Sequence, residues 1–91
     1  MDKIMSEVCE FLADGFEEIE GLTVVDLLRR AGIETRTVSI MGQEEIKGAH
    51  GIIVKADSLF ENTDFSEVKM LVLPGGMPGT IHLKEHKLSL I

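Results

Sequence analysis

The stretch from Val8 to Glu20, VCEFLADGFEEIE, constrains the fold more than any other part of the chain. It starts as an apolar run typical of a buried strand, turns at Asp14-Gly15, and continues as a helix that opens with glutamates. Glycine permits a sharp turn between strand and helix, and glutamates suit the positive end of the helix dipole. The order places a carboxylate just past the carboxyl end of a parallel strand, where open α/β sheets bind their ligands.

A second stretch, Met70 to Gly76 (MLVLPGG), has the same form, an apolar run that stops at a turn. We expect the two strand ends to lie side by side, with most of the function between them. Consecutive glycines, Gly75 and Gly76, expose backbone N–H groups that can hold an oxyanion. Each feature also has an ordinary explanation, because Pro-Gly-Gly is a common turn and a glutamate such as Glu20 often only complements the helix dipole.

The remaining pattern predicts an α/β fold with a mostly parallel, doubly wound sheet and right-handed crossovers. Weak helical or turn pieces are expected between 58 and 67, covering one sheet edge. The other predicted elements are a helix over 16–31, a strand over 33–40, a hairpin over 46–57, a strand over 69–73, and a helical segment from Thr80 onward.

The first helix carries more apolar surface than one buried stripe needs. Val24, Leu27, Leu28 and Ala31 fall at helical spacing and predict the buried face. Ile19, Leu22 and Val25 extend apolar surface around the cylinder. Two explanations stay open: a helix wedged deep in the domain, or one that packs on its sheet and also on a partner subunit.

Composition limits the classes of partner. The net charge of −7 argues against nucleic acid and anionic membranes, which require basic patches. There is no apolar run long enough for a membrane span and no secretory signal, and one cysteine, Cys9, cannot form a disulfide within the chain. These features predict a cytoplasmic protein.

Several familiar sites are not supported. Neither glycine-rich nucleotide motif is present, so no cofactor is expected. His82 and His86 lack the glutamate of a zinc-protease motif and His50 lacks cysteines at ligand spacing, so no metal is expected either. A receiver domain needs an aspartate at the end of its central strand, and that strand here ends in Pro74.

FLADGFEEIE, VVDLLRRAGI, GAHGIIVKAD and LVLPGG together resemble the N-terminal half of the ThiJ/PfpI family, in its branch of deglycases and thiazole-synthesis proteins. The similarity covers nearly all of 8–91. It implies a flavodoxin-like fold, usually dimeric through the first helix. It also implies a catalytic cysteine on a tight turn beside a protonated glutamate, here Glu20, with an oxyanion hole at Gly75 and Gly76.

The chain departs from this pattern twice. The family's nucleophile lies beyond the helix expected from Thr80, so 1–91 is expected to be a single incomplete domain, and Cys9 in the first strand is no substitute. In addition, Glu10 puts a charge into a strand that should be buried, which requires either an exposed strand or a charge partner.

The leading hypothesis is therefore the N-terminal part of a cysteine-dependent enzyme acting on small reactive carbonyls, of the glyoxalase or deglycase type. It would be completed by a C-terminal fragment or act in a homodimer. The alternatives are a non-catalytic interaction module, or a peptidase or stress chaperone of the same family.

Overall fold

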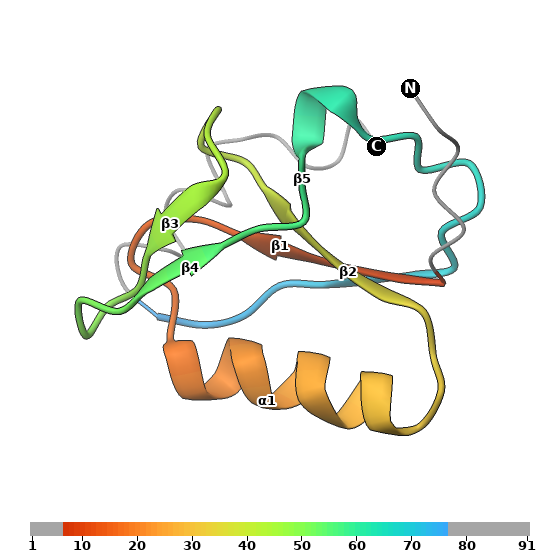
Figure 1. Ribbon diagram of the computed structural model, residues 1–91, viewed down its shortest axis with the longest axis horizontal. Coiled ribbons are helices and arrows are strands. Elements are labelled where there is room, and N and C mark those ends of the chain that lie inside the picture. The colour runs from red at the N-terminus through yellow and green to blue at the C-terminus, as the bar shows by residue number, and fades with distance from the viewer. Residues whose placement is uncertain (1–6, 77–91) are drawn as a thin grey trace.

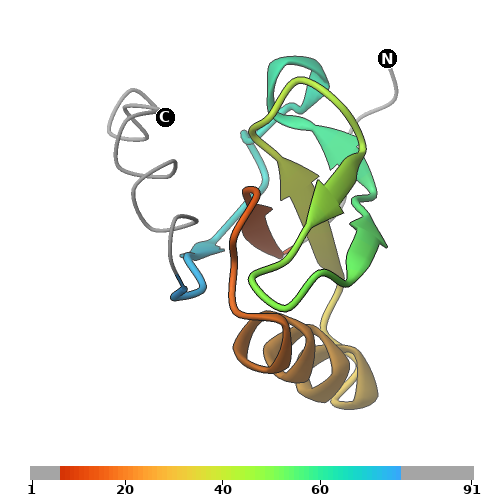
Figure 2. The ribbon, with the colours of Figure 1, turned by 90° about the vertical axis from the view of Figure 1, so that its left-hand side faces the viewer.

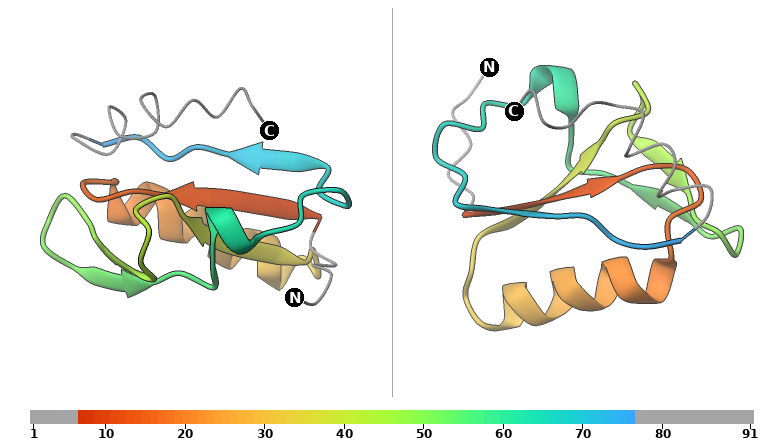
Figure 3. Two further views of the ribbon diagram at one scale, coloured as in Figure 1. Left: turned by 90° about the horizontal axis from the view of Figure 1, so that it is seen from above. Right: turned by 180° about the vertical axis from the view of Figure 1, so that it is seen from behind.

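A parallel sheet of four strands forms the centre of the structure, a computed structural model that describes residues 7–76. The strands lie in the order β5-β2-β1-β6 (Figure 3), and a separate antiparallel hairpin joins β3 to β4. One α-helix, α1, crosses over between β1 and β2. The elements are β1 (Val8–Leu12), α1 (Glu18–Arg30), β2 (Thr35–Ser39), β3 (Glu45–Lys47), β4 (Ile53–Lys55), β5 (Ser58–Leu59), the 3₁₀ helix η1 (Phe60–Asn62) and β6 (Met70–Val72).

Strand β1 is buried along its whole length because it has a partner on each side and cover on both faces. Alternate residues therefore enter different layers. Cys9, Phe11 and Ala13 face the side where η1 lies, and the ring of Phe11 meets those of Phe60 and Phe65 edge to face at 5.7 Å. Figure 1 shows α1 below the sheet and η1 above it, and Figure 2 shows the same arrangement from the side.

The predicted buried face of α1 is only partly right. Val24 and Leu28 are half-buried, but Leu27 is 60% exposed and Ala31 is exposed. The fully buried residues of the helix are Glu18, Gly21 and Val25. The cause is Gly21, where an added Cβ would lie 3.0 Å from the ring of Phe16. Because Gly21 has no side chain, the helix can lie close to the turn that follows β1. The helix therefore buries the face that contains Gly21.

The other predicted elements hold in position, with ends that differ from the prediction by one or two residues. The parallel strands and the β3–β4 hairpin are confirmed. The segment from 58 to 67 needs correction, because Ser58–Leu59 forms a short strand parallel to β2 and extends the sheet. The helical segment expected from Thr80 onward lies outside the described residues.

The first explanation offered for Glu10, an exposed strand, is wrong, because its side chain is fully buried. The second explanation, a charge partner, finds no support within residues 7–76, where neither carboxylate oxygen has a hydrogen-bond partner. It lies on the face of β1 that α1 covers, with one oxygen 3.6 Å from where a Cβ of Gly21 would be. Burial alone raises the pKa of Glu10 to about 8, so the carboxyl is protonated at neutral pH.

Candidate functional site

The ends of β1 and β6 lie side by side, as expected. These strands pair in parallel, with Val8 opposite Met70 and Glu10 opposite Val72. Figure 3 (right) shows β6 running beside β1 toward the start of α1. Where the strands end, the N–H of Glu17 donates a 2.8 Å hydrogen bond to the carbonyl of Gly75. This bond fixes the Pro-Gly-Gly turn against Glu17, the N-cap residue of α1.

Gly76 fits this place because it has no side chain. Its φ is +109°, and an added Cβ would lie 2.5 Å from the backbone nitrogen of Glu17 and 2.7 Å from the carbonyl oxygen of Gly15. The two turns are therefore in backbone contact. Any other residue at Gly76 would force them apart, since both obstacles are main-chain atoms.

Glu20 lies over the same turn. Its Oε1 is 2.8 Å from the position that a Cβ of Gly75 would take. The structure thus brings together the three predicted site residues Glu20, Gly75 and Gly76. Within residues 7–76, neither glycine N–H donates a hydrogen bond, and the Glu20 side chain is exposed. A carboxyl group beside two backbone donors can move a proton and hold a developing negative oxygen.

Cys9 is not part of this arrangement. It is fully buried in β1, on the face opposite α1. Burial raises the pKa of its thiol, and the nearby Arg36 only partly opposes that effect. Since the thiolate is the nucleophile, a buried thiol with a raised pKa is inert.

The two glycines are expected to respond very differently to alanine. Gly76→Ala should lower the free energy of unfolding by at least about 2 kcal/mol, because it adds both a strained φ and main-chain collisions. Gly75→Ala meets only the mobile end of Glu20 and should cost less than about 1 kcal/mol. Urea unfolding of the two variants measures the difference; equal losses would contradict the packing described for Gly76.

A polar cluster at the start of α1 was not expected from the sequence. Oε2 of the buried Glu18 accepts hydrogen bonds from the backbone N–H groups of His50 (2.8 Å) and Ile52 (3.3 Å), and its Oε1 lies 2.8 Å from Nδ1 of His50. Burial opposes ionisation of Glu18, but these hydrogen bonds outweigh it and hold its pKa at about 2. No sequence spacing links Glu18 to His50, which are 32 residues apart.

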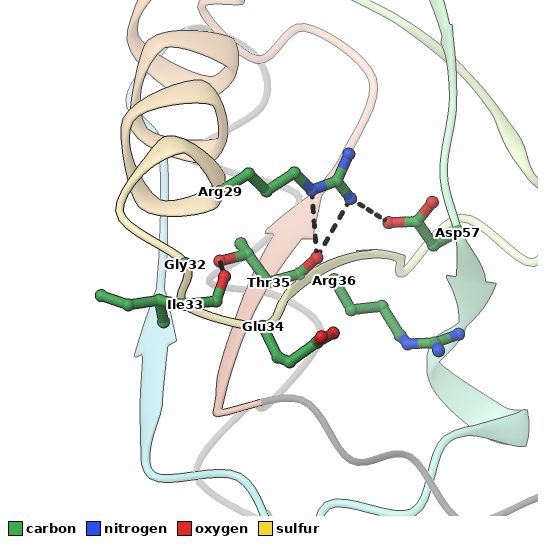
Figure 4. A pocket seen from close by; sticks show the side chains of 7 residues that line it. All are labelled: Arg29, Gly32, Ile33, Glu34, Thr35, Arg36 and Asp57. Carbon is green, nitrogen blue, oxygen red and sulfur yellow. Dashed lines mark hydrogen bonds and ion pairs between the residues drawn. The ribbon is translucent and has the colours of Figure 1, made fainter.

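A second missed feature lies at the opposite end of α1, in the pocket of Figure 4. Arg29 donates to the carbonyl of Thr35 at 3.0 Å and pairs with Asp57 at 2.8 Å. Asp57 in turn accepts from the backbone N–H of Thr37 at 2.9 Å. These contacts tie the end of the helix to β2 and to the residue before β5, so the pocket has a structural explanation.

The strand order, the crossover helix and the paired turns define an α/β protein with its candidate site at the carboxyl ends of β1 and β6. The model of the DJ-1/PfpI family matches residues 6–90, and the chain belongs to this family. The predicted flavodoxin-like fold is confirmed by solved structures. Drosophila melanogaster DJ-1beta matches with a TM-score of 0.83 and 29% identity over 90% of this chain and 44% of that one.

Curated relatives agree with this assignment. Protein DJ-1 homolog B of Arabidopsis thaliana is 36% identical over 84% of this chain and 17% of its own length. The deglycase TK1284 of Thermococcus kodakarensis is 34% identical over 86% of this chain and 47% of its own length. The chain therefore spans less than half of each of these relatives.

Among residues 7–76, no helix combines the length and apolar character that crossing a bilayer requires. The cytoplasmic location stays a prediction.

Proposed function

We propose that this chain is the N-terminal half of a cysteine-dependent enzyme that acts on small reactive carbonyl compounds, of the glyoxalase or deglycase type. The observation that carries the proposal is the position of the Glu20 carboxyl over Gly75, beside two backbone N–H groups with no partner within residues 7–76. Membership of the family and the name of the Thermococcus relative support the reaction class. The nucleophilic cysteine would come from a segment that follows residue 91.

The chemistry assigns each group one task. A thiolate attacks the carbonyl carbon, a C–S bond forms, and the π electrons of the C=O bond move to the oxygen. The N–H groups of Gly75 and Gly76 stabilise that oxygen as it gains negative charge. Glu20 then gives its proton to the oxygen, which yields a hemithioacetal, and the Glu20 carboxylate takes a proton back from the hemithioacetal carbon. Return of this proton to the neighbouring carbon gives a thioester, and water cleaves its C–S bond, releasing a hydroxy acid and the thiol.

Replacing Glu20 with glutamine tests this assignment. In the protein completed by its cysteine-bearing segment, Glu20→Gln should lower kcat/KM for methylglyoxal by about 100-fold or more, since general acid–base groups contribute that much. The melting temperature should stay within a few degrees, because Glu20 is exposed within residues 7–76. Glu45→Gln, an exposed change on β3, is the matched control. Unchanged turnover in Glu20→Gln would remove Glu20 from the mechanism.

We further propose that α1 is the surface through which two copies associate. Ile19 is 75% exposed and Leu22 is 37% exposed, one helical turn apart. Ile52, 53% exposed, donates its N–H to Glu18 beside them. Ile19→Lys should convert a dimer into a monomer, as measured by light scattering. The melting temperature of the variant should equal that of the native protein when both are compared at a concentration at which both are monomeric. Gln43→Lys, in an exposed turn, supplies the same charge as a control; a dimer that survives Ile19→Lys would exclude this end of α1 from the interface.

One observation favours a second candidate, a non-catalytic interaction module. β6 is the last strand of the described sheet, and Met70, Leu71 and Leu73 are 57%, 42% and 54% exposed. An apolar edge strand with free backbone groups can add a strand from another chain. Loss of activity in Glu20→Gln would favour the enzyme over this module.

A further inference from the structure

Three potential metal ligands converge where α1 meets the loop between β3 and β4. They are Glu17 and Glu18 at the start of the helix and His50 in the loop. Nδ1 of His50 lies 2.8 Å from Oε1 of Glu18 and 3.7 Å from Oε2 of Glu17. All the ligand atoms lie within 4.8 Å of one another. The group combines two carboxylate oxygens from neighbouring residues with one imidazole nitrogen from a distant part of the chain.

The two carboxylates are held in place from behind by the backbone. Oε1 of Glu17 accepts the N–H of Ile19 at 3.0 Å, which leaves Oε2 toward His50. Oε2 of Glu18 accepts the N–H groups of His50 and Ile52, which leaves Oε1 toward the same imidazole. Each carboxylate thus has one oxygen that orients it and one directed at the shared point. Hydrogen-bonded outer contacts of this kind orient the ligands of protein metal sites.

The spacing suits a small divalent ion. Zinc binds nitrogen and oxygen at about 2.0–2.2 Å in tetrahedral geometry, so its ligands lie roughly 3.3 Å apart. The observed separations from Nδ1, 2.8 and 3.7 Å, bracket that value. Small side-chain rotations would therefore open one pair and close the other. The imidazole is 64% exposed, so a fourth position is accessible to water.

We propose that Glu17, Glu18 and His50 form a binding site for a divalent transition metal ion of the zinc type, with water as the fourth ligand. The ion would replace the proton shared between His50 and Glu18 and would clamp the loop to α1. The site adjoins the Pro-Gly-Gly turn, since the N–H of Glu17 holds the carbonyl of Gly75. The proposal stands apart from the enzymatic one, because it requires only metal binding.

Acid should weaken the site. A proton and a metal ion compete for Nδ1 of His50, so the affinity for the metal should fall as the solution becomes more acidic. The titratable groups that face the His50 imidazole are the carboxylates of Glu17, the N-cap of α1, and Glu18, the first residue of α1.

Titration with ZnCl₂ in a calorimeter tests the proposal, in the protein completed by its C-terminal segment and with the cysteine of that segment replaced by serine. The expected result is one site per chain, weakened at least about tenfold in His50→Ala and in Glu17→Gln, since even outer-contact changes cost that much. The double variant His82→Ala/His86→Ala controls for the other histidines and should keep the site. If a variant fails to fold, NMR chemical-shift changes caused by zinc in the native protein locate the site instead. The largest changes should occur at Ile19, His50 and Ile52. Undiminished binding in folded His50→Ala, or shifts that spare these residues, would overturn the proposal.

Discussion

Replacing Glu10 with leucine is expected to raise the free energy of unfolding by about 3 kcal/mol at pH 7. Keeping the buried carboxyl protonated costs about 1.4 kcal/mol for each pH unit above its ordinary pKa of 4.5, and pH 7 lies roughly 2.5 units above that value. Leucine has nearly the same size and no polar atoms to leave unsatisfied. Few single substitutions stabilise a protein this much. The expected gain follows from a carboxyl that is fully buried and has no hydrogen-bond partner among the described residues.

The same carboxyl makes stability depend on pH in a defined direction. The unfolded chain releases the Glu10 proton near pH 4.5, whereas the folded chain keeps it until about pH 8. Between these values the unfolded state binds fewer protons, so this residue's contribution to stability is present below pH 4.5, falls as the pH rises, and is lost above about pH 8.

Urea unfolding at pH 5, 7 and 8.5 measures both effects, in a form of the protein that unfolds cooperatively. Glu10→Gln should remove this slope, and Glu10→Leu should widen its advantage as the pH rises. Glu45→Gln changes an exposed carboxylate and should follow the native protein. If the free energy of unfolding of the native protein varied with pH in the same way as that of Glu10→Gln, Glu10 would have a charge partner or be exposed to water, and the prediction would be wrong.

The second large effect concerns residues 1–91 alone, which we expect not to form a well-folded monomer. The β6 edge pairs only with β1 among the described strands, and its side chains expose apolar surface. This chain spans less than half of the length of the relatives that it matches, so those proteins contain further sequence. We therefore expect association, or partial unfolding, until a C-terminal segment or a second copy covers β6.

Size-exclusion chromatography and thermal melting of the isolated 91-residue chain test this expectation. Aggregates, a dimer or a broad, non-cooperative melt are predicted. Leu71→Lys places a charge on β6 and should reduce any association through that edge. A monodisperse native monomer with a sharp, reversible melt would contradict the view that this chain is half of a domain.

The meeting of Glu20 with the Gly75-Gly76 turn could be predicted from sequence because these residues lie at the ends of strongly patterned elements. Strand β1 and its Asp14-Gly15 turn are visible in the apolar run and the glycine, and β6 ends at Pro74-Gly75-Gly76 in the same way. Parallel pairing then aligns the two carboxyl ends. That Glu20 would lie on Gly75 rather than elsewhere followed from the family resemblance and not from spacing.

The features that could not be predicted from the sequence depend on tertiary contacts, which no local sequence pattern indicates. The buried face of α1 was misjudged because a glycine, Gly21, decides how the helix approaches Phe16. The burial of Glu10 depends on how closely α1 lies over β1. The contact between Glu18 and His50 depends on how the β3–β4 hairpin folds back on the helix, which joins residues 32 positions apart.

We propose that Glu20 and the Gly75-Gly76 turn form the reacting centre of a carbonyl-processing enzyme. A crystal structure of the completed protein, trapped with an aldehyde inhibitor on its cysteine, would test this assignment at the reacting atoms. We expect the former carbonyl oxygen at about 2.7–3.1 Å from the N–H nitrogens of Gly75 and Gly76, with a Glu20 oxygen within hydrogen-bond reach. An adduct whose oxygen points away from both glycines, or lies beyond the reach of Glu20, would contradict it.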